Sequence, residues 1–219
     1  MSEWAVLDPE LTLGLPAELT RLTGLDAFSH AAESYTSTQA GSMSDLLCET
    51  VMRTVVEALP AVLEDGTDIA GREKMQAAAA MGGWGLYMCG AHVGHSLAHV
   101  LGGALHMVHG AACAYGLPGV LELISEACPA KVQKIGEILG AEYTGQESTQ
   151  EIGQIAAAAY SRFCEKIGLL KIKQYDLDEE QMWDLARQIA GETFAVFSPV
   201  SITEERAYGL LEKALDKKQ

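Results

Sequence analysis

Residues 75–121 read MQAAAAMGGWGLYMCGAHVGHSLAHVLGGALHMVHGAACAYGLPGVL, and these 47 residues contain no Asp, Glu, Lys or Arg. The stretch nevertheless holds five of the six histidines of the 219-residue chain, together with ten glycines. About 20 apolar residues suffice to span a bilayer, but imidazole rings at this density would be costly in lipid. We therefore expect this uncharged stretch to form the central helices of a globular domain, with no membrane as partner.

Helical signals flank the uncharged stretch on both sides. Apolar residues in 42–63 recur at the spacing of one helix face. A helix that opens near Pro16 is predicted to close at Thr23-Gly24, and another is predicted over 25–37. The capping pattern, Ser or Asp followed three residues later by Glu or Gln, occurs at Ser148 and Glu151, Asp178 and Gln181, and Ser201 and Glu204. The sequence therefore predicts an all-α fold, a single helical-bundle domain over residues 1–219.

The segment Trp4-Ala-Val-Leu7, followed by Asp8-Pro9, is the exception and has the character of a short strand. A lone strand cannot satisfy its own backbone groups. We expect that it either frays or belongs to a sheet on a part of the protein outside this chain.

Acidic residues outnumber basic residues by 30 to 15, which gives a formal net charge of −15. Nucleic acid and anionic membranes are bound through clustered Lys and Arg, so neither is an expected partner. The five cysteines contain no C-x-x-C pair, and the N-terminus has no signal-peptide pattern. We expect a cytoplasmic protein with reduced thiols.

The histidines and one aspartate have the spacing of a metal site. Asp26 and His30 are four residues apart in a predicted helix, His95 and His99 repeat this spacing, and His109 follows after a Gly102-Gly103 break. Imidazole and carboxylate groups suit Zn²⁺ or Fe²⁺. Because each neutral ring in an uncharged core would otherwise need its own partner, a metal site is favoured over isolated core histidines.

Two further histidines, His92 and His106, are equally compatible with pocket lining and with core packing.

Two rival motifs in the uncharged stretch are weak. Gly94-His95-Ser96-Leu97-Ala98 fits the nucleophile elbow of a hydrolase, but no strand pattern precedes the serine. Gly83-Trp84-Gly85 begins a dinucleotide motif that Met88 interrupts.

Four segments together resemble the iron-containing alcohol dehydrogenase family. They are Asp8-Pro-Glu-Leu-Thr12, Thr23-Gly-Leu-Asp26-Ala-Phe-Ser-His30-Ala-Ala-Glu33, His95-Ser-Leu-Ala-His99-Val-Leu-Gly-Gly103, and His109-Gly110 with Leu117-Pro118. The similarity extends over nearly the whole chain. It departs from the family pattern at His92, an extra histidine, and at Gly119, where a histidine is common.

The resemblance implies a C-terminal helical domain that holds one divalent metal, most often Fe²⁺ and in some members Zn²⁺. It implies that Asp26, His30, His95 and His109 are the metal ligands, and that His99 lines the catalytic pocket and relays a proton. It also implies that NAD(P) binds to an N-terminal half that is absent here, of which residues 1–8 look like the last strand.

The function implied by the resemblance is that of the metal-binding catalytic half of an NAD(P)-dependent alcohol dehydrogenase. The metal would polarise the oxygen of a small alcohol or aldehyde for hydride transfer. The alternative is a truncated or split, non-catalytic metal-binding domain, and a weaker one is metal-assisted hydrolysis. A separate nucleotide-binding domain is the expected partner, and the surface it would cover, beginning at Trp4–Leu7, should be apolar and prone to homo-oligomer formation.

Overall fold

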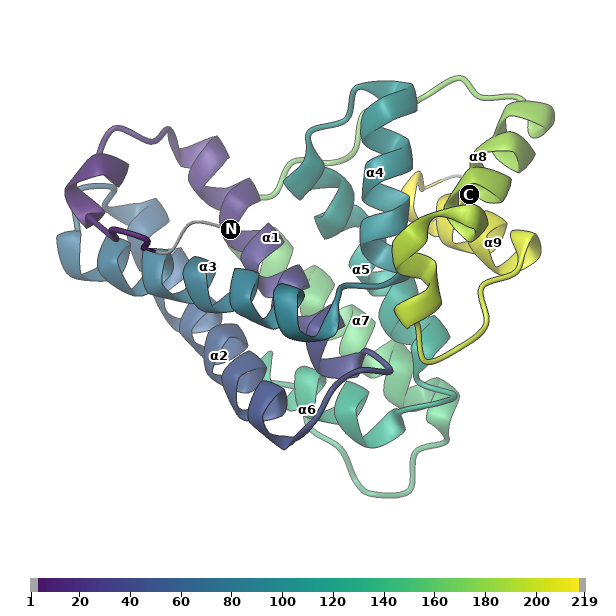
Figure 1. The fold of residues 1–219 in the computed structure, drawn as a ribbon, viewed down its shortest axis with the longest axis horizontal. Helices are drawn as coiled ribbons and strands as arrows, with labels where there is room; N and C mark the ends of the chain where they lie inside the picture. Colours follow the sequence, from purple (N-terminus) through teal and green to yellow (C-terminus); the bar gives the residue numbers. More distant parts are fainter. Residues whose placement is uncertain (1–3, 217–219) are drawn as a thin grey trace.

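The computed structural model describes residues 4–216, and within these residues it contains nine α-helices, two short 3₁₀ helices and no strand (Figure 1). The predicted all-α fold is therefore confirmed. The elements are η1 (Pro9–Thr12), α1 (Ala17–Thr36), α2 (Ser42–Glu64), α3 (Ile69–Cys89), α4 (Val93–Leu105), α5 (His109–Ile124), α6 (Pro129–Ile138), α7 (Thr149–Lys166), α8 (Glu179–Gly191), η2 (Thr193–Phe197) and α9 (Glu204–Ala214).

Helix α5 lies at the centre of the molecule and packs against α1, α4, α7 and α9 (Figure 1). Helices α1, α2 and α3 pack against one another on one side, and α8 and α9 pair on the other. Buried apolar side chains from α1 through α9 join in one core, whose largest fully buried members include Phe28, Leu97, Leu117 and Tyr160. This arrangement places the middle of α1 directly beside the helices of the uncharged stretch.

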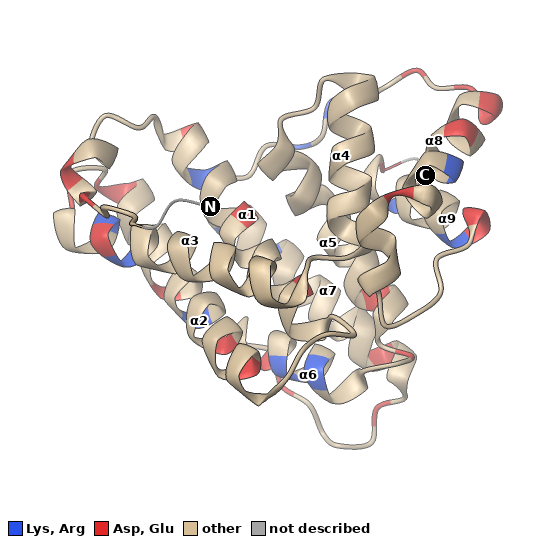
Figure 2. Cartoon of the chain, viewed as in Figure 1, with Lys and Arg blue, Asp and Glu red and all other residues tan. Residues whose placement is uncertain are grey.

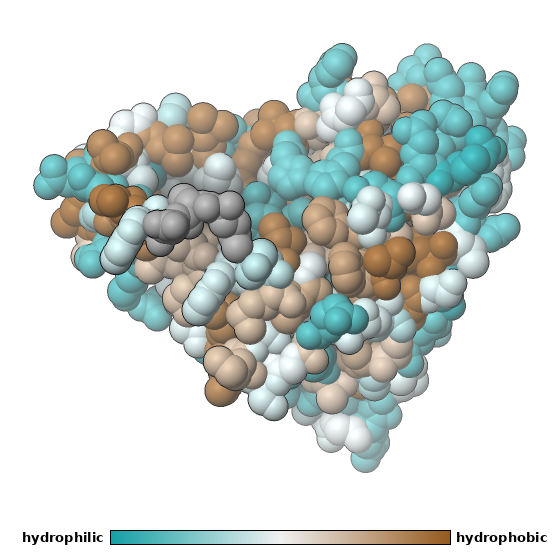
Figure 3. Space-filling model, viewed as in Figure 1, coloured by the Kyte–Doolittle hydropathy of each residue, from teal (hydrophilic) through white to brown (hydrophobic). Residues whose placement is uncertain are grey.

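The uncharged stretch forms most of α3, all of α4 and most of α5, and Figure 2 shows α4 without a charged residue. Helices α4 and α5 are largely buried, as predicted. Helix α3 differs, because Trp84 and Tyr87 are 62% and 65% exposed. Its small residues face α1 and α2, so its large side chains point outward. Figure 3 shows the surface over this helix as tan broken by white and pale teal, without strongly hydrophilic residues along most of its length.

The density of imidazole rings in the uncharged stretch argues against a membrane-spanning segment. Among residues 4–216, none of the helices combines the length and the apolar character needed to cross a bilayer.

The predicted helix end at Thr23-Gly24 is wrong, because α1 runs without interruption from Ala17 to Thr36. The glycine serves packing instead. A Cβ atom at Gly24 would lie 2.7 Å from Leu59 Cδ1 on α2, so glycine allows the two helices to approach closely. The predicted break at Gly102-Gly103 is also wrong, since both residues lie inside α4 and the helix ends at His106 in a left-handed conformation, φ 54°. No close packing explains these glycines, because a Cβ atom at Gly103 would have nothing within 4 Å.

The capping predictions were confirmed at two of three positions. Ser148 with Glu151 and Asp178 with Gln181 form capping boxes that open α7 and α8. The prediction for Ser201 is wrong by two residues, because Thr203 caps α9 by accepting the backbone N–H of Arg206. Ser and Thr cap helices through the same hydroxyl geometry, so the pattern alone did not distinguish them.

The predicted strand at Trp4–Leu7 is not formed. Residues 4–7 have no regular secondary structure, and Trp4 and Val6 are 86% and 88% exposed. The described part of the chain supplies no sheet with which they could pair. The part of the prediction that concerns residues 1–3 lies outside the described residues.

Candidate metal centre

Helix α1 supplies a row of polar side chains to the centre of the molecule. Asp26, His30 and Glu33 lie at i, i+4 and i+7, which places them on one helix face. Asp26 and His30 are about four-fifths buried, and the Glu33 side chain is 2% exposed. This face of α1 is turned toward α4 and α5.

Helices α4 and α5 bring further donors to the same point. His95 and His99 lie one turn apart on α4, and His109 is the first residue of α5. Gly110 explains how α5 reaches α1, because a Cβ atom there would lie 2.3 Å from the backbone oxygen of Leu22. Only glycine permits this approach of the two backbones, and the approach sets His109 beside Asp26.

The four predicted ligands lie together around one oxygen atom. Oδ1 of Asp26 is 3.7 Å from Nε2 of His30, 3.7 Å from Nε2 of His95 and 3.5 Å from Nε2 of His109. The two longer distances exceed those of hydrogen bonds. Two ligands about 2.1 Å from one metal at a tetrahedral angle lie about 3.4 Å apart. The spacing is therefore that of atoms arranged around a small cation.

A second observation supports this fit. Oδ1 of Asp26 is shielded from solvent and has no hydrogen-bond partner among the described residues. A buried carboxylate oxygen without a partner is costly, and a cation would satisfy it. Burial raises the pKa of Asp26, but the rings of His95, His30 and His109 outweigh burial and keep that pKa below its usual value.

The protonation of His30 and His109 also suits metal binding. Burial lowers the pKa of both rings, although the charge of Asp26 opposes this shift. Both imidazoles are therefore neutral at pH 7, and a metal binds a neutral imidazole through its free nitrogen lone pair.

Glu33 was not singled out from the sequence, yet it organises the site. One carboxylate oxygen lies 2.8 Å from Nδ1 of His95, and the other accepts the backbone N–H groups of His92 at 2.7 Å and His95 at 3.3 Å. Burial opposes its ionisation, but the neighbouring histidines and these hydrogen bonds lower the pKa of Glu33 to about 2. By accepting from Nδ1, the carboxylate directs Nε2 of His95 toward Asp26, an arrangement common around metal-binding histidines.

Glu192, which precedes η2, plays a similar part for His99 and was also missed. Its carboxylate lies 3.1 Å from Nδ1 of His99 and accepts the Ser96 hydroxyl at 2.8 Å. The His99 ring contacts the ring of Phe194 and stacks on His109 with centroids 5.5 Å apart. His99 thus lies beside the proposed ligands, with its side chain 39% exposed.

The structure argues against the hydrolase interpretation of Ser96. Ser96 lies inside α4 and no strand precedes it in the described chain. A nucleophile elbow requires a sharp strand-to-helix turn that exposes the serine, whereas Ser96 is fully buried and donates its hydroxyl hydrogen to Glu192.

The two histidines left open by the sequence lie outside the cluster. His92 is fully buried, occupies the N-cap position of α4 without a side-chain capping bond, and lies 2.9 Å from the Thr36 hydroxyl, so it belongs to the core beside Glu33. His106 is exposed and ends α4 in a left-handed conformation, which histidine adopts more readily than most residues.

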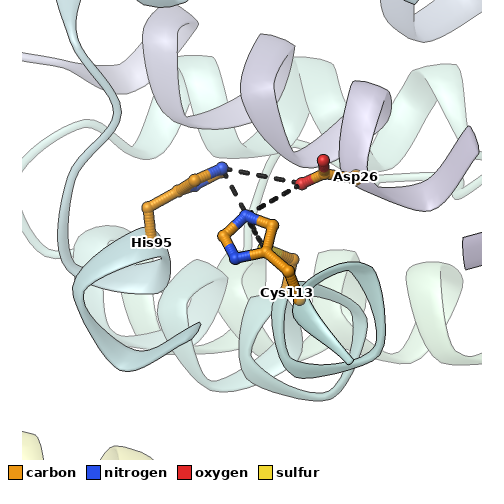
Figure 4. A group of neighbouring side chains, drawn as sticks. Asp26, His95 and Cys113 are labelled. Atoms are coloured by element: carbon orange, nitrogen blue, oxygen red, sulfur yellow. Dashed lines mark hydrogen bonds and ion pairs between the residues drawn. The ribbon is translucent and has the colours of Figure 1, made fainter. Parts of the chain in front are cut away.

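Cys113 joins the cluster without having been predicted. Its Sγ lies 3.6 Å from Nε2 of His109 and 3.9 Å from Nε2 of His95. Figure 4 shows Asp26, His95 and Cys113 pointing toward one another. The spacing from His109, four residues along α5, was a signal that the sequence already contained.

Comparison with known proteins agrees with this fold. The family model of the C-terminal part of Fe-containing alcohol dehydrogenases matches residues 20–215. The chain therefore belongs to the iron-containing alcohol dehydrogenase family, and it matches the C-terminal portion of that family.

Individual relatives are similar over part of their length. A probable alcohol dehydrogenase, EutG, of Escherichia coli is 37% identical over 64% of this chain and 35% of the relative. A 1,3-propanediol dehydrogenase of Klebsiella pneumoniae is 34% identical over 75% of this chain and 42% of the relative.

Solved structures give the same result. The crystal structure of a 1,3-propanediol oxidoreductase superposes with a TM-score of 0.85 at 30% identity, over 94% of this chain and 54% of that one. An alcohol dehydrogenase from Oenococcus oeni gives a TM-score of 0.87 at 28% identity. The chain spans about half the length of the solved relatives it matches.

Proposed function

We propose that this chain is the metal-binding catalytic half of an NAD(P)-dependent alcohol dehydrogenase, with residues 1–219 as a single domain. In this proposal, Asp26, His30, His95 and His109 hold one divalent metal ion. The observation that carries the proposal is the convergence of three imidazole nitrogens on one buried carboxylate oxygen without a hydrogen-bond partner. The family name indicates iron, and the same donors suit zinc.

When bound, a divalent metal supplies Lewis-acid chemistry, which lowers the pKa of an alcohol and polarises an aldehyde oxygen. The residues of the chain orient the metal-binding rings and move a proton to or from the substrate. Glu33 holds His95 in the tautomer that turns Nε2 toward Asp26. Glu192 holds Nδ1 of His99 and leaves its other nitrogen to exchange a proton between the substrate hydroxyl and solvent, since the ring is partly exposed.

Small alcohols and aldehydes are the proposed substrates, in keeping with the names of the propanediol dehydrogenases that the chain resembles. The hydride acceptor would be NAD(P) held by a separate nucleotide-binding domain. Gly83 and Gly85 lie inside α3 and form no phosphate-binding loop. The exposed apolar side chains of Trp4, Trp84 and Tyr87 suit the docking of such a domain, or self-association when it is missing.

A second candidate is a split or truncated metal-binding domain that does not catalyse on its own. The observation that favours it is that residues 4–216, as described, contain no strand and no phosphate-binding loop, so they offer no evident nucleotide site of their own. Both candidates share the metal site and differ in whether a cofactor-binding partner is available.

The test is NAD(P)-dependent turnover of small primary alcohols and diols by the metal-loaded chain, with and without a separately expressed nucleotide-binding domain of a relative. We expect one metal per chain and negligible turnover by the chain alone, because positioning the nicotinamide against the substrate is worth roughly 7–11 kcal/mol. Turnover that appears when the second domain is added supports the first candidate. Metal binding without turnover in either mixture supports the second, and robust turnover by the chain alone would show that the cofactor binds here after all.

A further inference from the structure

The side chain of Cys113 lies among the proposed metal ligands. It lies on α5 one turn after His109, and it is 1% exposed. Its sulfur faces two imidazole nitrogens, Nε2 of His109 at 3.6 Å and Nε2 of His95 at 3.9 Å. Buried structural cysteines usually behave as small apolar side chains, whereas this one points into a group of metal-binding atoms.

The geometry of the four atoms supports a ligand role. One donor atom each from Asp26, His95, His109 and Cys113 can be chosen so that all four lie within 4.8 Å of one another. A sulfur about 2.3 Å from a zinc ion and a nitrogen about 2.1 Å from it are separated by roughly 3.6 Å at a tetrahedral angle. The distance from the sulfur to Nε2 of His109, 3.6 Å, equals this value, and the distance to Nε2 of His95, 3.9 Å, is slightly longer.

We propose that Cys113 is an additional metal ligand in this chain, a thiolate that binds the same ion as Asp26, His95 and His109. The inference rests on the proposed metal site and extends it to five donors, because His30 stays among the proposed ligands although it lies outside the group of four described above. The thiol gives its proton to solvent as the metal binds. Since thiolate is a soft donor, its presence favours Zn²⁺ and Co²⁺ over Fe²⁺.

The first experiment uses Co²⁺ as a spectroscopic probe. Cobalt-loaded wild-type protein should show a thiolate-to-metal charge-transfer absorption in the near ultraviolet. Cys113→Ser should lose this absorption. Cys164→Ser should retain it, because Cys164 is a buried cysteine on α7 that is 5% exposed and lies outside the cluster. Circular dichroism checks that both variants fold.

The second experiment examines the metal's neighbours directly in the wild-type protein. X-ray absorption of the zinc-loaded wild-type protein, prepared without thiol reductants, should show a sulfur scatterer at about 2.3 Å beside nitrogen and oxygen at about 2.0–2.2 Å. Affinity alone does not decide the question, because losing a residue that only supports a ligand also weakens binding about 10–100-fold. We expect Cys113→Ser to reduce the preference for Zn²⁺ over Fe²⁺ at least tenfold.

The outcomes separate this inference from the proposed function. Stoichiometric zinc or cobalt with only nitrogen and oxygen neighbours would overturn the role of Cys113 and leave the metal site in place. Failure of the wild-type protein to bind either metal would overturn both. A sulfur signal that survives in Cys113→Ser would assign the thiolate to another cysteine and refute the inference.

Discussion

Replacing Glu33 by Gln tests whether one carboxylate organises the metal site. The change keeps the size of the side chain and turns one of its two acceptor oxygens into a donor. In the native protein one oxygen lies 2.8 Å from Nδ1 of His95, and the other accepts two backbone N–H groups, those of His92 and His95. A glutamine whose oxygen accepts the two backbone N–H groups turns its NH2 group toward Nδ1 of His95. Either two donors then face each other, or the ring changes tautomer and loses the free Nε2 that a metal would bind.

The magnitude follows from the same contacts. The folded pKa of Glu33 is lowered from 4.5 to about 2, which corresponds to about 3 kcal/mol of stability. The raised pKa of His95 describes the same interaction and is not added to this figure. Removing one member of a buried ion pair costs about 3–5 kcal/mol by independent measure. We therefore expect Glu33→Gln to lower the free energy of unfolding by about 3 kcal/mol at pH 7.

The pH dependence gives a second signature. Because the folded pKa lies below the unfolded one, the stabilising contribution is complete above pH 4.5 and is lost as the pH falls toward 2. The difference in stability between wild type and Glu33→Gln should therefore shrink over this window. Metal affinity at pH 7 should fall about 10–100-fold, as is usual when the partner of a ligating histidine is removed.

The assay is urea unfolding of the metal-free protein, followed by far-ultraviolet circular dichroism at several pH values. Glu57→Gln is the control, because Glu57 is 71% exposed and pairs with Lys74 on the surface. Exposed pairs contribute about 0–1 kcal/mol, so the control should remain near wild type. A Glu33→Gln protein as stable as the control at pH 7, or a stability difference unchanged between pH 7 and pH 3, would refute the reasoning.

Three further predictions concern the ligands, the metal and the packing. Asp26→Ala should weaken metal binding more than His109→Ala, because it removes the negative charge among the four ligands proposed from the sequence. Competition with a chromophoric chelator measures the two affinities, and a greater loss in His109→Ala would contradict the prediction. Protein purified in air should carry more zinc than iron by elemental analysis, following the general affinity order of divalent metals, and excess iron from a zinc-containing buffer would refute this. Gly110→Ala should destabilise the protein by about 2 kcal/mol or more, because the new Cβ would lie 2.3 Å from the Leu22 backbone oxygen. Gly103→Ala, where nothing lies within 4 Å, should be neutral or stabilising in the same urea titration.

Regular helices were predictable from the sequence because their signals are local. The helix over 42–63 and the caps at Ser148 and Asp178 depend on residues a few positions apart. Gly24 and Gly102 suggest helix ends in the sequence but lie inside α1 and α4. A helix keeps a glycine where a neighbouring helix packs closely against it, and it also tolerates one where the surroundings are open. That neighbour, Leu59 in the case of Gly24, is 35 positions away in the sequence.

The candidate site shows the same division. Asp26, His30, His95 and His109 were selected by residue type and spacing, and the structure brings them within contact of one oxygen. The sequence contained a local signal for Glu33, seven residues after Asp26 on the same helix face. The contact between Glu192 and His99 joins residues 93 positions apart, and no local pattern in the sequence announces it.

The position of α5 between helices made earlier and later has a consequence for synthesis on the ribosome. Its partners α1 and α4 precede it, whereas α7 and α9, which cover its remaining faces, come from the last third of the chain. At about 5–20 residues per second, roughly 5–20 s pass between the completion of α5 and that of α9. All the proposed ligands therefore leave the ribosome well before the helix that carries His109 is covered. The docking of α7 and α9 is therefore the step that buries the remaining apolar faces of this helix.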